Sequence, residues 1–217
     1  MYGINYHMLT IALLLLSQSV MAQENPSDAL WDSLRKDDVA GVVAQIKSGI
    51  SVDSSTDTET PLTYAIKRDS TEMVKALLDL GANANLVQPI SQCTPLIVAA
   101  KNDKPKAVEL LLVHQADVNV TGTFGRNSLN VAALFDSVDV AHLLLTKTNI
   151  DVNARGKLCP LAIASRQGYL NFVKILLNES KVAPSVVCLA SAKKMAQGNM
   201  EPGSEHEAIL VLLNSLK

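Results

Sequence analysis

Histidine is the side chain that most often supplies acid–base or metal chemistry near neutral pH, and this chain of 217 residues has four. His7 lies in an apolar N-terminal segment, and His114, His142 and His206 fall far apart in the sequence. His206-Glu207 lacks the second histidine of a zinc-binding helix. No motif places a serine, a cysteine or a carboxylate beside any of these histidines for catalysis. We therefore expect neither an enzyme nor a metal site, and interpret the histidines as solvent-exposed or capping residues.

The glycines and the overall charge also argue against phosphate and nucleic-acid ligands. Gly122 and Gly125 lie close together, but no strand precedes them and no Lys-Ser or Lys-Thr pair follows, as a phosphate-binding loop requires. A formal net charge of −2 gives no molecule-wide field that would attract nucleic acid or an anionic membrane. We expect no cofactor and no nucleic-acid partner.

Residues 1–22 have the pattern of a secretory signal peptide. Leu9 to Leu16 is an apolar run interrupted only by Thr10, and Val20-Met21-Ala22 ends it with small residues at the positions that precede cleavage. The run is shorter than the roughly 20 apolar residues that span a bilayer. We expect cleavage after Ala22 and export to a bacterial periplasm, with secretion from the cell as the alternative. No membrane insertion is expected after cleavage.

The elements that must position any functional residue come from an internal repeat. Its clearest copy begins at Thr94-Pro95-Leu96, continues through two alanines and a leucine-rich helix, and ends at Ala116-Asp117-Val118-Asn119. The leucines equivalent to Leu96 are separated by 34, 33 and 32 residues, and they are Leu62, Leu96, Leu129 and Leu161. Self-similarity at this period indicates stacked helical units, each of which buries its apolar stripe only against its neighbours.

A period near 33 that starts with Thr-Pro-Leu-x-x-Ala resembles the ankyrin repeat. The resemblance covers about residues 28–217. It implies an all-α fold, an ankyrin-repeat solenoid in which each unit is a turn followed by two antiparallel helices, with loops projecting as fingers. It also implies a non-enzymatic protein-binding scaffold. In this family the finger tips and the inner face of the first helices usually make the contact surface.

The pattern divides the chain into a signal peptide (1–22), an N-terminal capping repeat (23–57), four repeats (58–185) and a C-terminal capping repeat (186–217). The first helix should begin with Ser27 or Asp28 as its N-cap. Gln115 stands where a helix would favour a left-handed glycine. Gln197 to His206 resembles a loop inserted into the last unit. The six units are expected to form one cooperative stack.

The resemblance assigns a contact surface residue by residue, from the variable finger positions and the pair that follows the alanines of each first helix. Phe124, Leu134 and Phe135 are expected to lie together as an apolar anchor, although Phe135 could instead pack under the second helix. The basic side chains around them predict a partner with an acidic contact surface, although such charges are also ordinary on a solvated surface. The predicted partner-binding residues are Lys67, Arg68, Lys101, Phe124, Arg126, Leu134, Phe135, Arg155, Leu158 and Arg166.

Three cysteines form an odd set in a compartment that export would make oxidising. Cys159 and Cys188 belong to adjacent repeats at nearly matching positions. Packed helices lie about 8–10 Å apart, whereas a disulfide needs Cα atoms closer than about 7 Å. A bond between these two cysteines would therefore need a local shift, and the sequence does not decide it. Cys93 is expected to be a single thiol, either a small core residue or a redox group.

Three roles fit an exported, monomeric ankyrin binder. One is an immunity protein or inhibitor that covers the active site of a toxic enzyme. Another is an accessory factor for a periplasmic stress-defence enzyme. The third is a secreted effector that acts on a host protein. Loss of the partner's activity, gain of that activity, and recovery of the chain outside the cell would distinguish the three.

Overall fold

The computed structural model describes residues 26–56, 58–155, 158–179 and 183–216. The predicted signal peptide and its cleavage site lie outside these residues. Two compact units, Met1–Ile50 and Ser51–Lys217, divide the chain, and we describe each by itself. The described residues form twelve α-helices and one short 3₁₀ helix, with no strand among them. The prediction of an all-α fold is thus confirmed.

The described part of the first unit is a helix pair, α2 (Pro26–Arg35) and α3 (Val39–Lys47). Leu30, Leu34 and Val42 of these helices are buried. Asp38 caps α3, because its carboxylate accepts the backbone N–H of Gly41 at 2.9 Å. The predicted N-cap of the first helix was wrong. α2 already begins at Pro26, and proline suits the first helical position because its missing N–H leaves no bond unmade.

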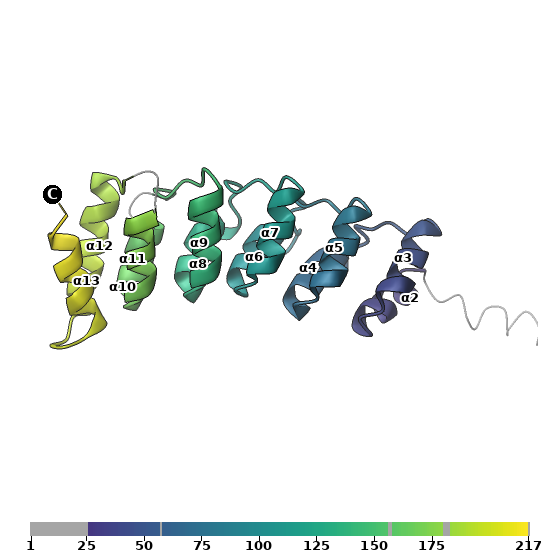
Figure 1. Ribbon diagram of the computed structural model, residues 1–217, viewed down its shortest axis with the longest axis horizontal. Coiled ribbons are helices and arrows are strands. Elements are labelled where there is room, and N and C mark those ends of the chain that lie inside the picture. The colour runs from purple at the N-terminus through teal and green to yellow at the C-terminus, as the bar shows by residue number, and fades with distance from the viewer. Residues whose placement is uncertain (1–25, 57, 156–157, 180–182, 217) are drawn as a thin grey trace, which may run out of the picture. The chain divides into compact units, whose positions relative to one another are not determined.

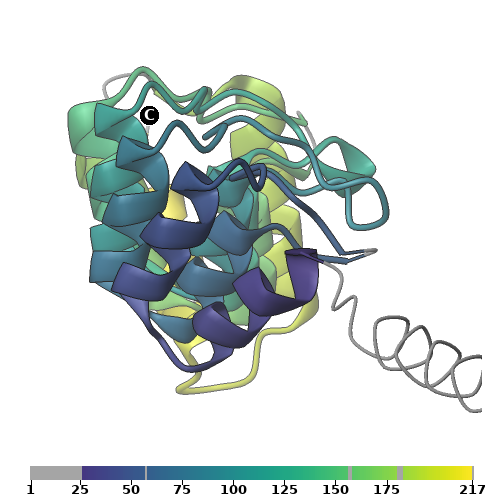
Figure 2. The ribbon, with the colours of Figure 1, turned by 90° about the vertical axis from the view of Figure 1, so that its right-hand side faces the viewer.

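Five helix pairs follow one another along the described part of the second unit (Figure 1). Each first helix packs on the first helix of the next pair, and each second helix on the next second helix, so the helices form two rows. Figure 2 shows the loops that join the pairs projecting to the same side. The pairs are α4 (Pro61–Arg68) with α5 (Thr71–Asp79), α6 (Pro95–Lys101) with α7 (Pro105–Val113), α8 (Ser128–Phe135) with α9 (Val138–Lys147), α10 (Pro160–Gln167) with α11 (Leu170–Glu179), and α12 (Val186–Gly198) with α13 (Glu205–Asn214).

Every first helix of this unit begins with a side chain that accepts the backbone N–H three residues later. This contact satisfies one of the N–H groups left open at a helix start. In repeat four asparagine replaces threonine at this position. The helix cap is kept, because Asn127 and Asn130 form a reciprocal capping box. The capping residues are Thr60, Thr94, Asn127, Cys159 and Ser185.

The core of the second unit is built from the periodic leucines of both helix rows. Leu62, Leu96, Leu129 and Leu161 are all at most 2% exposed. All six residues from Pro95 to Ala100 are buried, because α6 has a first helix on each side and α7 behind it. Stacking of the repeats therefore supplies the burial that no single pair could supply.

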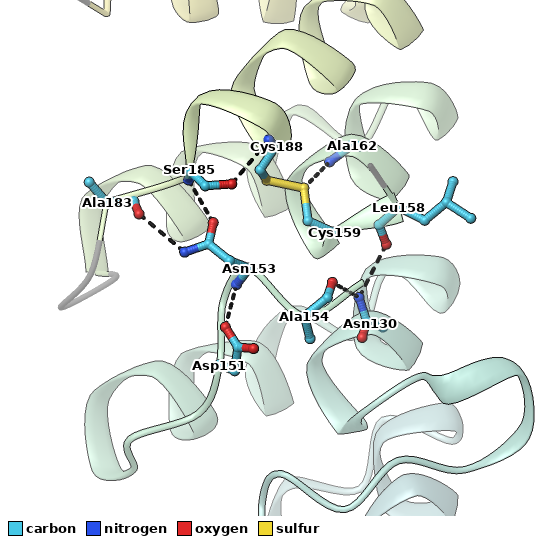
Figure 3. Close-up of a disulfide and its surroundings, with 10 residues drawn as sticks. All are labelled: Asn130, Asp151, Asn153, Ala154, Leu158, Cys159, Ala162, Ala183, Ser185 and Cys188. Atoms are coloured by element: carbon cyan, nitrogen blue, oxygen red, sulfur yellow. Dashed lines mark hydrogen bonds between the residues drawn. A yellow bond between two sulfur atoms is a disulfide. The ribbon is translucent and has the colours of Figure 1, made fainter. Parts of the chain in front are cut away.

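Asparagine side chains tie successive repeats together beyond this apolar contact. Asn85, Asn119 and Asn153 stand 34 residues apart. The amide nitrogen of each donates to a carbonyl 30 residues later in the chain. The amide oxygen of each accepts the backbone N–H 32 residues later, at 2.7, 2.9 and 2.6 Å. Figure 3 shows the last of these, with Asn153 held between Ala183 and Ser185.

Two local features of the second unit had been predicted from the sequence, the helix end at Gln115 and the loop inserted between Gln197 and His206. Gln115 takes the left-handed conformation, with φ of 61°, so the helix end is kept although glycine is absent. The inserted loop is shorter than predicted and covers only residues 199–204. α12 continues to Gly198 because Asn199 closes it with its backbone N–H, and Ser204 opens α13 by accepting the N–H of Glu207.

Candidate protein-binding surface

Loops precede the first helices of repeats three, four and five, and the last two of them carry four of the predicted contact residues, Phe124, Arg126, Arg155 and Leu158. We call them finger three (86–93), finger four (120–126) and finger five (154–158), of which 156 and 157 lie outside the described residues. A contact surface that is already ordered loses less conformational entropy on binding, so the contacts that hold these loops bear on their function.

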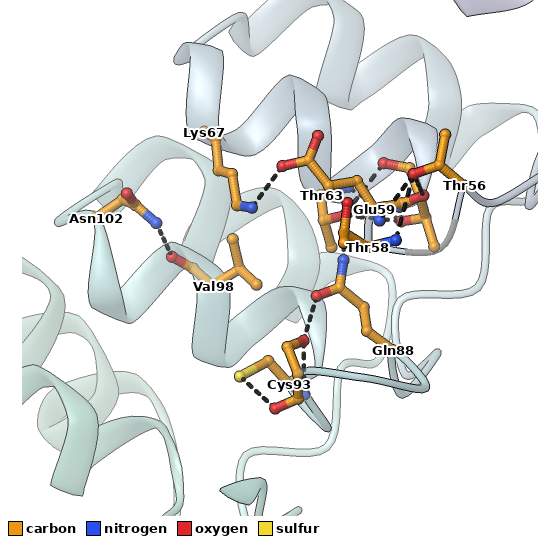
Figure 4. Close-up of polar contacts among 11 residues, drawn as sticks. Thr56, Thr58, Glu59, Thr63, Lys67, Gln88, Cys93, Val98 and Asn102 are labelled. Carbon is orange, nitrogen blue, oxygen red and sulfur yellow. Dashed lines mark hydrogen bonds and ion pairs between the residues drawn. The ribbon is translucent and has the colours of Figure 1, made fainter.

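Finger three is anchored by one of its own residues, Gln88, whose side chain is only 2% exposed. The amide nitrogen of Gln88 donates to Thr63 Oγ1 at 2.7 Å, and its amide oxygen accepts the hydroxyl of Ser91 at 2.6 Å. The backbone N–H of Gln88 also donates to the carbonyl of Cys93 at 3.1 Å, which closes the loop. Figure 4 shows Gln88 reaching from the finger to the helix of the preceding repeat. The tip of finger three is therefore fixed to α4.

Finger four rests directly on finger three. The hydroxyl of Thr123 donates to the carbonyl of Ser91 at 2.5 Å. A Cβ at Gly122 would lie only 2.7 Å from the carbonyl oxygen of Gln92, so this approach needs glycine. The backbone N–H of Gly122 also donates to the carbonyl of Arg126, which closes the loop around a short 3₁₀ turn.

Finger five is held by a side chain of the preceding repeat. The amide nitrogen of Asn130, a fully buried residue, donates to the carbonyls of Ala154 and Leu158 at 3.4 and 3.3 Å. The backbone N–H of Leu158 donates to the carbonyl of Arg155, which stands in a left-handed conformation. Each of the three fingers is thus fixed by the repeat before it.

Phe124 is the most exposed aromatic side chain of the described residues, at 72%. It lies in the left-handed region, with φ of 62°, an unusual conformation for a bulky residue. The guanidinium carbon of Arg126 lies 5.4 Å from the centre of its ring, within cation–π range. Finger four therefore presents an aromatic face that carries a positive charge.

Phe135 forms a second pair of this kind at the end of α8. The ring is 48% exposed, so the alternative that it packs under the second helix is wrong. Lys101 Nζ lies 5.7 Å from the ring centre, and Leu134 beside it is half-buried. Phe124 precedes α8, whereas Leu134 and Phe135 end it, and the eight residues of this helix span about 12 Å. The expectation that the three side chains form one apolar anchor stays a prediction.

The basic side chains of the predicted surface do not all carry free charge. Lys67 is paired with Glu59 at 2.5 Å (Figure 4), so its charge is largely balanced within its own repeat. Arg68, Arg155 and Arg166 are exposed. The positive character of the surface therefore rests on the arginines and Lys101 more than on Lys67.

Four aspartates that the sequence analysis did not consider occupy the turn between the two helices of successive pairs. Asp37, Asp69, Asp103 and Asp136 all have positive φ. Burial raises the pKa of the Asp103 carboxyl, and the charge of Asp139 adds to this rise. Burial likewise raises the pKa of Asp136, with a further contribution from Asp103. Their spacing of one per repeat is visible in the sequence and would have identified them.

The structure bonds Cys159 to Cys188, with Cα atoms 5.8 Å apart (Figure 3). The two residues do not occupy matching positions. Cys159 is the N-cap of α10, whereas Cys188 lies three residues after the N-cap Ser185. Helical side chains tilt toward the N-terminus, which brings the sulfur of Cys188 back toward α10. Both cysteines are fully buried, and Cys93 is a half-buried free thiol.

Neither a metal site nor a membrane span emerges from the part of the chain that the structure describes. It contains no group of three or more histidine, cysteine or carboxylate side chains placed to hold an ion. None of its helices is both long and apolar enough to cross a bilayer.

Stacked helix pairs with rigid loops along one side define a helical-repeat protein. A family model of ankyrin repeats in three copies matches residues 1–121 and 96–186, well over half of the chain. The chain therefore belongs to the ankyrin-repeat family. Ankyrin repeats are protein-binding modules, and membership assigns the chain a protein-interaction role.

One relative shows how far the similarity to a characterised protein extends. Ankyrin repeat, SAM and basic leucine zipper domain-containing protein 1 of Carollia perspicillata is 41% identical over 69 residues, which are 31% of this chain. The aligned segment is only 14% of that relative's length.

Proposed function

We propose that this chain is a non-enzymatic, exported binder that holds one partner protein on its finger tips and on the inner face of its first helices. The observation that carries the proposal is Phe124. A phenylalanine that is 72% exposed and held in a left-handed turn loses both burial and backbone freedom. Such costs persist where the surrounding structure fixes them, and they cluster at sites of function.

The charge of the exposed side chains supports a partner with an acidic contact surface. Arg68, Arg126, Arg155 and Lys101 belong to the predicted contact set, and each arginine guanidinium can donate two parallel hydrogen bonds to a carboxylate. Such pairs act mainly on the rate of association and on specificity, so binding should weaken as salt rises. The two cation–π pairs would add an aromatic or apolar contact at each end of α8.

The disulfide supports the proposed export. Disulfides persist in secreted and periplasmic proteins and are rare in the reducing cytosol. The apolar segment Leu9 to Leu16 and the small residues before Gln23 supply the expected leader. Fractionation of cells that express the full chain tests this directly. Recovery of a shortened chain, beginning at Gln23, from the periplasm or the medium is expected.

The contact surface is tested with the double variant Phe124→Ala/Phe135→Ala. The mature chain is used to capture its partner from extract of its own cells, and the affinity for that partner is then measured by titration. We expect affinity to fall by about tenfold or more, since exposed aromatic anchors commonly contribute over 1 kcal/mol each. The helical circular dichroism should not change. Equal affinity of variant and wild type would show that this surface does not bind the partner.

The effect on the captured partner separates the possible roles. An inhibitor or immunity protein would abolish the partner's activity at one-to-one stoichiometry. An accessory factor would raise it. An effector would be recovered outside the cell, bound to a host protein.

A further inference from the structure

α12 exposes an apolar face whose counterparts in the preceding repeats are buried. Val187 stands two residues after the N-cap of its helix, as do the four periodic leucines of the other first helices, yet it is 51% exposed. Ala190 stands five residues after the same cap and is exposed as well. The alanines at its position in the other first helices are at most 1% exposed, and they are Ala65, Ala99, Ala132 and Ala164.

The four preceding first helices differ from α12 because each is followed by another first helix. α4 packs on α6, α6 on α8, α8 on α10, and α10 on α12. α12 itself packs on α10 and α13, and no further first helix follows it within the described residues (Figure 1). Its buried side consists of Cys188, Ala192 and Ala196. The side with Val187 and Ala190 therefore has the residues of a repeat interface without a described helix on it.

A hollow of about 410 Å³ lies on this side of α12, and we call its lining residues the end face. They are Val186, Val187, Ala190, Ser191 and Lys194. The last four follow the i, i+3, i+4, i+7 spacing of a single helix face, and Val186 beside them is 85% exposed. The outer face of a terminal repeat is ordinarily polar. Exposed apolar surface beside a charged residue instead marks a site of interaction.

We propose that the end face binds an amphipathic helix of a partner protein that carries carboxylates beside its apolar stripe. This surface goes beyond the one proposed above and does not rest on it. The predicted contact residues of that surface all lie between Lys67 and Arg166, whereas the end face belongs entirely to α12.

The repeats themselves favour a helix as the occupant. In each preceding pair the first helix receives another helix, and the small alanine at the position of Ala190 lets the two approach closely. The spacing of the end face is also that of helix-in-groove recognition. An extended segment would favour the edge of a sheet, and the described residues contain no strand.

Charge selects an acidic helix and disfavours a second copy of this chain. α12 contains Lys193 and Lys194 but neither aspartate nor glutamate, and Lys194 lines the hollow. A twofold dimer brings the same surface of both copies together. Two α12 helices would then meet with lysines on both sides and no carboxylate from either helix to balance them. Carboxylates on a partner helix would complement Lys194.

A fluorescein-labelled peptide of about 18 residues, long enough to form a helix, tests the proposal by fluorescence polarisation with the mature chain. It carries leucine along one helix face and glutamate and alanine elsewhere, and it is used at concentrations where it does not self-associate. One control peptide has the same composition with the leucines spread around the helix, and another has lysine in place of glutamate. We expect the acidic amphipathic peptide to bind at least about tenfold more tightly than either control. Equal binding of either control would overturn the proposal.

Variants of α12 locate the binding site. Val187→Ser should weaken the acidic peptide at least about fivefold, whereas Val113→Ser, at a residue 77% exposed on α7, should not. Lys194→Glu should shift the preference toward the lysine peptide, whereas Lys106→Glu, at an exposed residue of α7, should not. The helical circular dichroism should not change in any of the four. Equal effects in a variant and its control would contradict the proposal.

Two further measurements distinguish the end face from other sites and occupants. Phe124→Ala/Phe135→Ala should leave the affinity for the peptide unchanged, and a loss there would place the peptide on the fingers and overturn the proposal. Light scattering should find the mature chain monomeric. A dimer that Val187→Ser dissociates would make a second copy the occupant and would overturn it as well. None of these outcomes affects the proposed function, which is tested with the captured partner.

Discussion

Single residues in left-handed conformations mark nearly every turn of this protein, and most of them are not glycine. Eight non-glycine residues of the described chain have positive φ, and four of these are the aspartates between the two helices of a pair. Aspartate tolerates this conformation better than most residues. The other four, Gln92, Gln115, Phe124 and Arg155, have no such tolerance. Those positions are where single substitutions should be most informative.

Gln115→Gly should raise stability. A non-glycine residue in the left-handed region costs about 1–2 kcal/mol, and the extra freedom of an unfolded glycine offsets about 0.5–1 kcal/mol. A net gain of about 0.5–1 kcal/mol is expected in urea unfolding. The side chain is exposed, and its backbone carbonyl keeps the bond from Asn85. Gln45→Gly, inside α3, should lower stability instead, and a gain there would contradict this explanation.

Asp136→Asn should stabilise the protein at neutral pH and lose this effect in acid. Burial raises the folded-state pKa of Asp136, so the ionised carboxylate disfavours the folded state above that pKa. As the pH falls through the raised pKa, Asp136 of the folded wild type becomes protonated, and the cost of burying its charge disappears. Below the ordinary value of 3.8 both states are protonated and no difference remains. Urea unfolding at pH 7 and near pH 4.5 should show a gain under about 1 kcal/mol that shrinks in acid. A stability difference between variant and wild type that grows in acid would contradict this explanation.

At the scale of the element, each first helix is fixed by its cap and by the first helices next to it, and each second helix by one apolar stripe. The capping residue differs among Thr60, Thr94, Asn127, Cys159 and Ser185, but the contact does not. The second helices present Leu77, Leu111, Leu144 and Leu176 to the core, all at most 3% exposed. The register of these stripes decides which residues of a second helix face outward.

Leu111→Ala should cost about 2–5 kcal/mol, because a fully buried leucine leaves a cavity that the stack closes only in part. Val113→Ala, two residues later in α7 and 77% exposed, should cost under about 0.5 kcal/mol. Thermal and urea unfolding of the two variants would measure the difference. Equal costs would mean that the register of α7 is wrong.

At the scale of the whole molecule, the second unit is a stack whose repeats contact only their neighbours, closed at one end by a disulfide. Stability in such an array is approximately the sum of repeat and interface contributions. The Cys159–Cys188 bond joins α10 to α12 across a sequence separation of 29 residues. It therefore acts on the last interface rather than on the stack in general.

Loss of the disulfide should loosen the C-terminal end selectively. The double variant Cys159→Thr/Cys188→Ala keeps a capping side chain at 159, as in Thr60, and should cost about 3–4 kcal/mol by loop entropy. Hydrogen exchange should accelerate in α12 and α13, while α4 to α7 stay protected. Reductant should destabilise the wild type alone. Uniform acceleration through the second unit would contradict a local role.

The sequence by itself determined the helical class, the repeat period, the starts of the repeated first helices and the core leucines. These are local or periodic properties, so the order of residue types along the chain specifies them. Only the tertiary structure decided the pairing of Lys67 with Glu59 and the bond between Cys159 and Cys188. Each of these depends on how far one helix or loop is offset from the next in three dimensions. Sequence spacing constrains that offset to a few ångströms, which is too coarse to place side chains in contact.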